Sequence, residues 1–144
     1  MTNKPDDATI AAWVGLSRAQ RIALRRVEAR LKAAKLPPLA WYDALWELEK
    51  AGEAGLRPFD LERLMLFEQY NLSRLADRLA KAGLIDRQAC PDDARGHVLN
   101  ITPAGRALRR EMWTIYERAI EEAVGARLAS AEAQQLAALL LKLE

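Results

Sequence analysis

Apolar residues at helical spacing run along almost the whole chain, and this periodicity constrains the fold more than any other feature. In residues 68–82 they recur at i, i+3, i+4 and i+7, the spacing of one face of an α-helix. These residues are Leu72, Leu75, Ala76 and Leu79. Gly83 comes next, and glycine is favoured just past a helix end because it adopts a left-handed conformation without strain. The segment is therefore predicted to be a helix with one face in a core.

The same spacing predicts helices elsewhere in the chain. They span residues 9–34, 39–50 and 59–66, then 103 to about 125, and 130 to the C-terminal end. Pro37 and Pro38 end the first of them, because proline lacks the N–H and clashes with the preceding turn. Thr102 and Pro103 are a good N-cap and first helical residue, and Ser130 is the predicted cap of the last helix.

One stretch departs from the helical pattern. Residues 84–89 and 97–102 are short strand-like runs, and the sequence CPDDARG between them holds the Pro, Asp and Gly that hairpin loops favour. The expected order is thus four helices, two antiparallel strands and two helices. It predicts a mainly α fold with one small β-hairpin (α+β).

Length and composition bound the class of protein. The 144 residues suggest a single domain, 1–144, or one protomer of an oligomer, and one cysteine and one histidine supply neither an internal disulfide nor a Cys/His zinc site. The sequence has no basic-then-apolar leader and no run of about 20 apolar residues, so we expect a cytoplasmic protein without a membrane span. It also has no Gly-rich phosphate loop and no Ser/His/Asp constellation, so we expect neither an enzyme nor a metal or cofactor.

The outer face of the predicted helix 68–82 is polar and carries arginines. Once the apolar face is buried, four side chains lie together on the outside: Asn71, Arg74, Arg78 and Lys81. A short helix, a turn and a second helix with such a face form the helix-turn-helix pattern, whose second helix fits the major groove of DNA. Arg can bond guanine and Asn can bond adenine with two hydrogen bonds each, while Ser73 can bind a phosphate oxygen. An ordinary solvated helix has the same pattern, so this helix alone leaves both interpretations open.

The hairpin directly after this helix favours DNA binding, because a two-stranded ribbon in that place is a wing. Its loop is predicted to place Arg95 at the tip, with Asp93 two residues before it. An arginine there can enter a narrow minor groove, where the negative potential is concentrated. The alternative is a tight hairpin whose arginine is free in solvent. Together the two features predict a winged helix-turn-helix over residues 39–102.

The charge and the apolar pattern of the flanking helices add to this interpretation. The net charge is only +2, but residues 8–38 carry seven basic side chains against Glu28 alone. The helix that starts at Pro103 carries two apolar rows, one with Leu108, Met112, Ile115 and Ala119, the other with Trp113, Tyr116, Ile120 and Val124. A surface helix of a soluble monomer needs one such stripe, so the second row suggests contact with another chain.

Three stretches, taken in their order, resemble the multiple antibiotic resistance regulator (MarR) family of winged-helix repressors. They are NLSRLADRLAKAGLIDR, DDARG and LNITPAGRAL, and the helices before them are similar to those of one branch of the family. The resemblance covers about residues 10–143, and it depends on the order and spacing of motifs that are weak one by one. Two positions depart from the family pattern: Ile101 replaces a leucine before Thr102, and Gly96 stands where a second basic residue often follows the wing arginine.

The resemblance implies an obligate homodimer that binds a pseudo-palindromic operator in double-stranded DNA. Residues 9–36 and 103–144 would be its N- and C-terminal dimerisation helices. The family's base-contacting positions map to Tyr70, Asn71 and Arg74, with Arg78 as a further candidate. Ser73 falls among its phosphate contacts, and Arg95 corresponds to the minor-groove residue of the wing.

The resemblance also implies a small-molecule pocket in which phenolic or other aromatic acids are frequent ligands. The aromatic residues that could border it are Trp13, Trp41, Tyr42, Trp46, Trp113 and Tyr116. Aromatic residues at helical spacing are also common core residues, so both roles stay open. Cys90, in the predicted wing loop, has no basic neighbour in the sequence that would activate it, so a redox role is not favoured.

A different class of function remains possible on sequence grounds. The chain could be a helical protein–protein interaction module that does not bind DNA, with the doubly striped helix facing an unrelated partner. A gel-shift assay separates the two classes. The operator, the effector and the choice between repressor and activator are not determined by the sequence.

Overall fold

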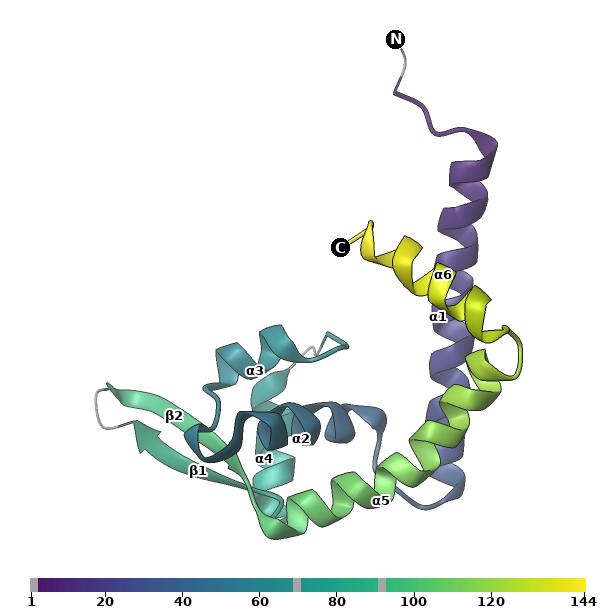
Figure 1. Cartoon of the computed structure of the whole chain (residues 1–144). Coiled ribbons are helices and arrows are strands. Elements are labelled where there is room, and N and C mark those ends of the chain that lie inside the picture. The colour runs from purple at the N-terminus through teal and green to yellow at the C-terminus, as the bar shows by residue number, and fades with distance from the viewer. Residues whose placement is uncertain (1–2, 69–70, 91–92) are drawn as a thin grey trace. The chain divides into compact units, whose positions relative to one another are not determined.

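The structure is a computed structural model that describes residues 3–68, 71–90 and 93–144, with the backbone alone for residues 93–95. Figure 1 shows the elements in chain order. The helices are α1 (Asp7–Ala33), α2 (Leu39–Ala51), α3 (Pro58–Leu64), α4 (Leu72–Lys81), α5 (Pro103–Ile120) and α6 (Ser130–Leu141), with short helical turns η1 (Gly52–Ala54) and η2 (Glu121–Gly125). The strands β1 (Ile85–Cys90) and β2 (Asp93–Ile101) form one antiparallel hairpin. The prediction of a mainly α fold with a small hairpin is confirmed.

Some predicted boundaries move, each for a local reason. α1 begins two residues earlier than predicted because Asp6 Oδ1 accepts a hydrogen bond from the Thr9 N–H at 2.7 Å. Hydrogen bonds from the Thr9 side chain and from this N–H lower the pKa of Asp6. The prediction that Ser130 caps α6 is wrong. Ser130 is the first helical residue, and the N–H of Ala129 before it donates to Glu132 Oε1 at 2.9 Å.

The chain forms two compact units, which are described separately. The winged-helix unit is Leu31–Ile115. The terminal-helix unit holds the chain up to Arg30 together with Tyr116–Glu144. Helices α1 and α5 each contribute to both units.

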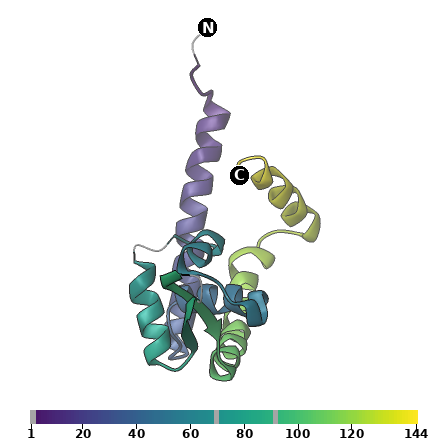
Figure 2. The ribbon, with the colours of Figure 1, turned by 90° about the vertical axis from the view of Figure 1, so that its left-hand side faces the viewer.

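The winged-helix unit packs α2, α3, α4 and the hairpin around one apolar core. Its buried side chains are Ala44, Leu45, Leu48, Leu61, Met65, Leu72, Leu75, Ala76, Leu79, Leu84, Ile85, Leu99 and Ile101. Figure 2 is seen from the side of the hairpin tip and shows α4 (teal) beside the strands. Burial of this apolar surface is the main favourable term in folding. The predicted core face of residues 68–82 is confirmed, since all four of its members belong to this core.

Helix α4 ends where the sequence predicts. Gly83 has a φ of +75°, a left-handed conformation that L side chains rarely adopt. The Gly83 N–H donates to the Ala80 carbonyl at 3.0 Å, and the Leu84 N–H donates to the Leu79 carbonyl at 2.9 Å. This pattern satisfies the last carbonyls of the helix and turns the chain into β1.

The hairpin is regular near its base and irregular near its tip. Pairing is in register as far as Ala89 opposite His97, and it then shifts to Cys90 opposite Asp93. The shift leaves residues 94–96 as a bulge in β2. Of the predicted loop CPDDARG, Cys90 and residues 93–96 therefore belong to the strands, residues 91–92 lie outside the described residues, and Arg95 belongs to the bulge.

The terminal-helix unit keeps many large apolar side chains exposed. Val27 and Ala119 are buried, and Arg30 forms an ion pair with Glu122, with Nε and Oε2 3.1 Å apart. The exposed apolar residues of this unit are Ile10, Trp13, Val14, Leu16, Ile22, Ile120, Val124, Leu136, Leu139, Leu141 and Leu143. On α5 the first predicted row is buried at Met112 and Ala119, whereas Ile120 and Val124 of the second row are exposed.

Candidate nucleic-acid interface

Helix α4 presents the predicted polar face to solvent. Asn71, Ser73, Arg74 and Arg78 are all exposed, and the apolar side chains on the opposite side of the helix are buried. This packing fixes the rotation of the helix about its axis, so the polar side chains lie on one surface. Asp77 is exposed as well, so the face is not purely cationic.

Asn71 has a structural task that the sequence analysis missed. It is the N-cap of α4, and its Oδ1 accepts a hydrogen bond from the Arg74 N–H at 3.0 Å. An asparagine just before an amphipathic run is a recognised sign of a helix start and could have revealed this role. The amide nitrogen of the same side chain is left to donate elsewhere.

The turn before α4 is held by Asp43 of α2, which sequence reasoning also missed. The carboxylate oxygens accept hydrogen bonds from the N–H groups of Leu66 and Phe67, each at 3.0 Å. Burial raises the pKa of Asp43, and these two hydrogen bonds oppose the rise. The one available signal was a carboxylate in the apolar sequence WYDALW, at a position whose neighbours face the core.

The wing is joined to α4 by an ion pair. Arg87 of β1 places Nη2 against Oδ1 of Asp77 of α4. Both side chains are partly exposed, at 35% for Arg87 and 61% for Asp77, so the pair contributes little to stability. It does place the base of the hairpin against the exposed side of the helix.

Cys90 has a cationic neighbour that the sequence does not reveal. Arg57, just before α3, lies with Nη2 3.1 Å from Cys90 Sγ. The expectation that no basic group adjoins this thiol is therefore wrong in space, although it is right along the chain. The two residues are 33 positions apart, and only the pairing of β1 with the rest of the winged-helix unit brings them together.

The structure does not describe the side chains of two residues that are predicted to contact DNA. Tyr70 lies outside the described residues. Arg95 is placed by its backbone alone, in the bulge of β2. Both remain predictions.

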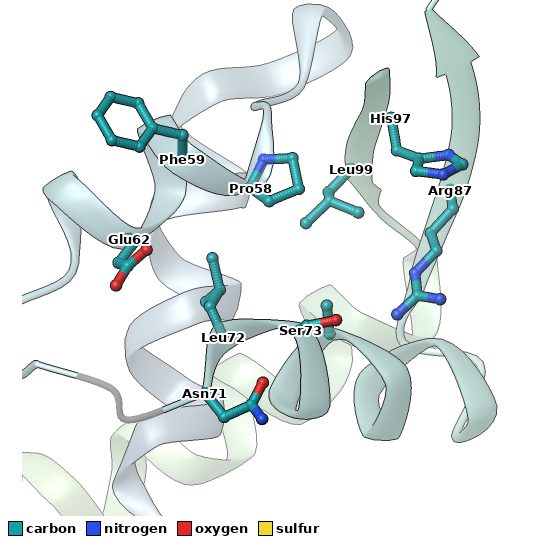
Figure 3. A pocket seen from close by; sticks show the side chains of 10 residues that line it. Pro58, Phe59, Glu62, Asn71, Leu72, Ser73, Arg87, His97 and Leu99 are labelled. Atoms are coloured by element: carbon teal, nitrogen blue, oxygen red, sulfur yellow. The ribbon is translucent and has the colours of Figure 1, made fainter. Parts of the chain in front are cut away.

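A cavity of about 520 Å³ lies where α3, the start of α4 and the wing meet. Figure 3 shows Arg87 and His97 on the wing side, Pro58 on α3 and Ser73 in the first turn of α4, while the ring of Phe59 lies at the outer edge and points away from them. The α3 side is thus apolar apart from the carboxylate of Glu62, and the other side carries a guanidinium, an imidazole and a hydroxyl. This combination suits a small ligand with an apolar ring and an anionic or polar group.

The predicted ligand-binding aromatics have mixed surroundings. Tyr42 is buried and stacks on Trp113 with ring centroids 6.0 Å apart. Trp46 is half-exposed, and the guanidinium of Arg109 lies 4.9 Å from its ring centroid. Trp41 packs against the core.

Arg109 of α5 forms an ion pair with α2 beside these aromatics. Its Nη2 lies 2.9 Å from Oε2 of Glu49, and both side chains are largely buried. Burial raises the pKa of Tyr42, and a hydrogen bond with Arg109 opposes the rise. The remaining two predicted aromatics, Trp13 and Tyr116, belong to the terminal-helix unit.

Metal sites and membrane-spanning helices are absent from the described part of the chain. No group of three or more His, Cys, Asp and Glu residues there could hold a metal ion. No helix in the same residues is long and apolar enough to cross a membrane.

The architecture matches known regulators over nearly its full length. A MarR family transcriptional regulator from Streptomyces coelicolor, solved in complex with DNA, is 22% identical, with a TM-score of 0.86 over 99% of this chain and 89% of that one. A mutant MarR from E. coli complexed with operator DNA is 22% identical, with a TM-score of 0.78 over 96% and 99%. BpsR of Bordetella bronchiseptica, whose DNA binding is regulated by 6-hydroxynicotinic acid, is 24% identical, with a TM-score of 0.79 over 92% and 98%. At these identities the matches show the shared fold.

The sequence itself also matches a family. Residues 35–96 match the sequence profile of the MarR family, and this range runs from the residues before α2 through the wing bulge. It therefore includes the capped helix α4, the turn held by Asp43 and the ion pair between Arg87 and Asp77. Members of this family are transcription regulators and not enzymes. Over residues 35–96 the chain is thus similar to the MarR family, and its fold is that of the solved MarR regulators.

Proposed function

We propose that this chain is a sequence-specific regulator of transcription that binds double-stranded DNA and acts as a homodimeric repressor. The observation that carries the proposal is the exposed face of α4, where a buried leucine side holds polar and cationic residues together beside a wing. An α-helix with such a face fits the major groove. The DNA complexes of the Streptomyces coelicolor and E. coli relatives support the same use of the fold here.

Each proposed DNA contact has a distinct role. Tyr70, Asn71 and Arg74 contact base edges in the major groove, and Arg78 is a further base contact. Ser73 binds a phosphate oxygen, which fixes the register of the protein without carrying sequence information. Arg95 enters the neighbouring minor groove from the wing.

The exposed apolar surface of the terminal-helix unit supports a homodimer. Its side chains come from α1, the end of α5, η2 and α6, and a second copy related by two-fold symmetry offers the same surface. Two symmetric recognition helices would then read half-sites about 34–36 Å apart. Sedimentation at low concentration should give the mass of a dimer, and a monomer at concentrations that still bind DNA would contradict this assignment.

We further propose that a small aromatic or phenolic acid releases the protein from DNA. The cavity beside α4 supports this idea, since Pro58, Leu72 and Leu99 can contact a ring while Arg87 and His97 meet a carboxylate. The regulation of BpsR by 6-hydroxynicotinic acid supports the same ligand class. Such a ligand releases DNA only if it binds the free protein more tightly than the DNA-bound protein.

Tryptophan fluorescence can separate this cavity from the pocket predicted on the aromatics of α1, α2 and α5. The cavity is lined by Phe59 but by none of the four tryptophans, whereas the predicted pocket includes all four. A hydroxybenzoic acid that binds without quenching, and whose binding is lost in Arg87→Gln, points to the cavity. Quenching that Trp46→Phe removes points to the predicted pocket.

Selection of bound duplexes from a random pool tests the central proposal. We expect a pseudo-palindromic consensus and an affinity that falls steeply with salt, because neutralised phosphates release counterions. The selection is then repeated with a panel of hydroxylated benzoic and nicotinic acids. If no duplex is enriched, the chain is better explained as a helical protein–protein interaction module.

A further inference from the structure

The backbone just after α3 is held by hydrogen bonds to one carboxylate of α2. The chain is anchored in the core at Met65 on one side and at Leu72 on the other, which are 8% and 7% exposed. Between them Leu66 is 71% exposed and Phe67 is half-buried, so the side chain of Leu66 cannot fix the backbone. The Leu66 and Phe67 N–H groups hold this part by donating hydrogen bonds to Asp43.

The two amides need such an acceptor. α3 ends at Leu64, and the Met65 N–H makes its last helical bond, to the Leu61 carbonyl at 3.0 Å. Beyond that point the backbone no longer follows the helix, so the next N–H groups lose their intrahelical acceptors. The carboxylate of Asp43 serves both of them, one with each oxygen.

Burial of the Asp43 carboxylate is unfavourable for the free energy of folding. Among the residues whose exposure is described, it is the one charged side chain that is buried, at 6%. The charged neighbours that influence it are Glu47 and Lys50 of the same helix, and the Lys50 ammonium is bonded to Glu47 at 2.9 Å. Desolvation of a carboxylate is unfavourable unless hydrogen bonds offset it, so the amides of the turn are its essential partners.

We infer that Asp43 is a positioning residue for DNA recognition, which holds the backbone of Leu66 and Phe67 and thereby sets where helix α4 begins. This inference rests on the proposed DNA-binding function. The N-cap Asn71 is only four residues after Phe67, so a displacement of the turn moves the first turn of α4. That first turn carries the side chains proposed to read bases, and recognition by paired hydrogen bonds tolerates little displacement.

The test compares Asp43→Asn with Glu47→Gln. Both changes remove one carboxylate from α2 and keep the size of the side chain, but Glu47 bonds Lys50 and not the turn. In Asp43→Asn one amide loses its acceptor and faces an N–H donor instead. Two measurements are made: amide hydrogen exchange at Leu66 and Phe67, and affinity for the duplex that the wild type selects from a random pool, beside affinity for an unrelated duplex.

We expect faster exchange at both amides in Asp43→Asn and an affinity for the selected duplex that is weaker by about tenfold or more. Affinity for the unrelated duplex should change little, because contacts that depend on phosphate charge tolerate a shifted helix. Glu47→Gln should match the wild type in all measurements. Loss of specific relative to non-specific binding is a readout that a general loss of stability would not produce.

Two outcomes overturn the inference. Unchanged exchange at Leu66 and Phe67 would show that Asp43 does not hold the turn, and faster exchange with wild-type specific affinity would show that the turn does not position α4. If Asp43→Asn does not fold, Asp43→Glu serves instead, since it keeps the charge but displaces the carboxylate oxygens. We then expect a smaller increase in exchange at both amides and a smaller loss of affinity for the selected duplex. If the wild type selects no duplex, the proposed function is wrong. The exchange data then still show whether Asp43 holds the backbone of Leu66 and Phe67.

Discussion

Asn71 Oδ1 accepts a hydrogen bond from the backbone N–H of Arg74 at 3.0 Å, so one proposed base contact holds the backbone of another. Because this bond caps α4, Asn71 influences both the stability of the helix and the place of its neighbour. This bond uses the oxygen of the Asn71 side chain, so the proposed contact with a base would use its amide nitrogen.

Substitutions at Asn71 can separate its role as the N-cap of α4 from its proposed contact with a base. Asn71→Ala should lower the free energy of unfolding by about 0.5–2 kcal/mol, because the Arg74 N–H loses its acceptor. Asn71→Ser should keep most of the stability, since serine is an equally good cap, but it should change the base preference at one position in each half-site. Urea unfolding and duplex selection measure the two effects. If Asn71→Ser selects the wild-type sequence, Asn71 is a cap and not a reader.

Arg74→Ala should weaken specific binding by about 1–3 kcal/mol and relax the base preference at one position in each half-site. The side chain is exposed and packs in no core, so the free energy of unfolding should hardly change. Lys81→Ala, at the other end of the same helix, is the matched control for lost charge. A selection with Arg74→Ala that returns the wild-type consensus would count against base reading by this residue.

Arg95→Ala should weaken binding chiefly to duplexes with A·T-rich flanks, where the minor groove is narrow and its negative potential is strong. The bulge in β2 supports a wing that bends at this residue. Affinities for one consensus with A·T-rich or G·C-rich flanks provide the measurement. An equal loss on both flanks would assign Arg95 to general phosphate attraction.

Glu49→Gln should lower the free energy of unfolding by about 1–3 kcal/mol, because it leaves the largely buried guanidinium of Arg109 without its counter-charge. The Arg109 Nε is already buried without a hydrogen-bond partner, so little can compensate for the loss. Glu47→Gln breaks the pair with the more exposed Lys50 and should cost at most about 1 kcal/mol. Equal losses in the two variants would show that burial of the Arg109 pair is unimportant.

Asp43 should make stability depend on pH in a direction opposite to that of an ordinary salt-bridged carboxylate. Because burial raises its pKa above 3.8, the folded protein takes up a proton before the unfolded chain does as the pH falls. The contribution of Asp43 is therefore fully present below 3.8 and is lost as the pH rises through the higher, folded pKa. The difference in unfolding free energy between wild type and Asp43→Asn should shift in favour of the wild type on acidification. A shift the other way would mean that the two hydrogen bonds outweigh burial.

Local patterns in the sequence were enough to predict the elements and the core face of α4. The spacing of its leucines, the left-handed glycine at 83 and the Thr102-Pro103 helix start each act over a few residues, so they can be read along the chain. Thr102 does cap α5, since its Oγ1 accepts a hydrogen bond from the Gly105 N–H at 3.1 Å. The prediction of exposed polar residues on α4 follows from the same period and is confirmed.

Tertiary structure alone decided the contacts between residues far apart in the chain. Asp43 meets the turn at Leu66 and Phe67, and Arg57 meets Cys90, only because α2, α3 and the wing fold onto one core. No local period encodes such pairings, since charge and hydrogen-bonding capacity in a sequence do not state which partner lies opposite. The sequence thus determined which side of α4 faces solvent, and the fold determined what holds that helix in place.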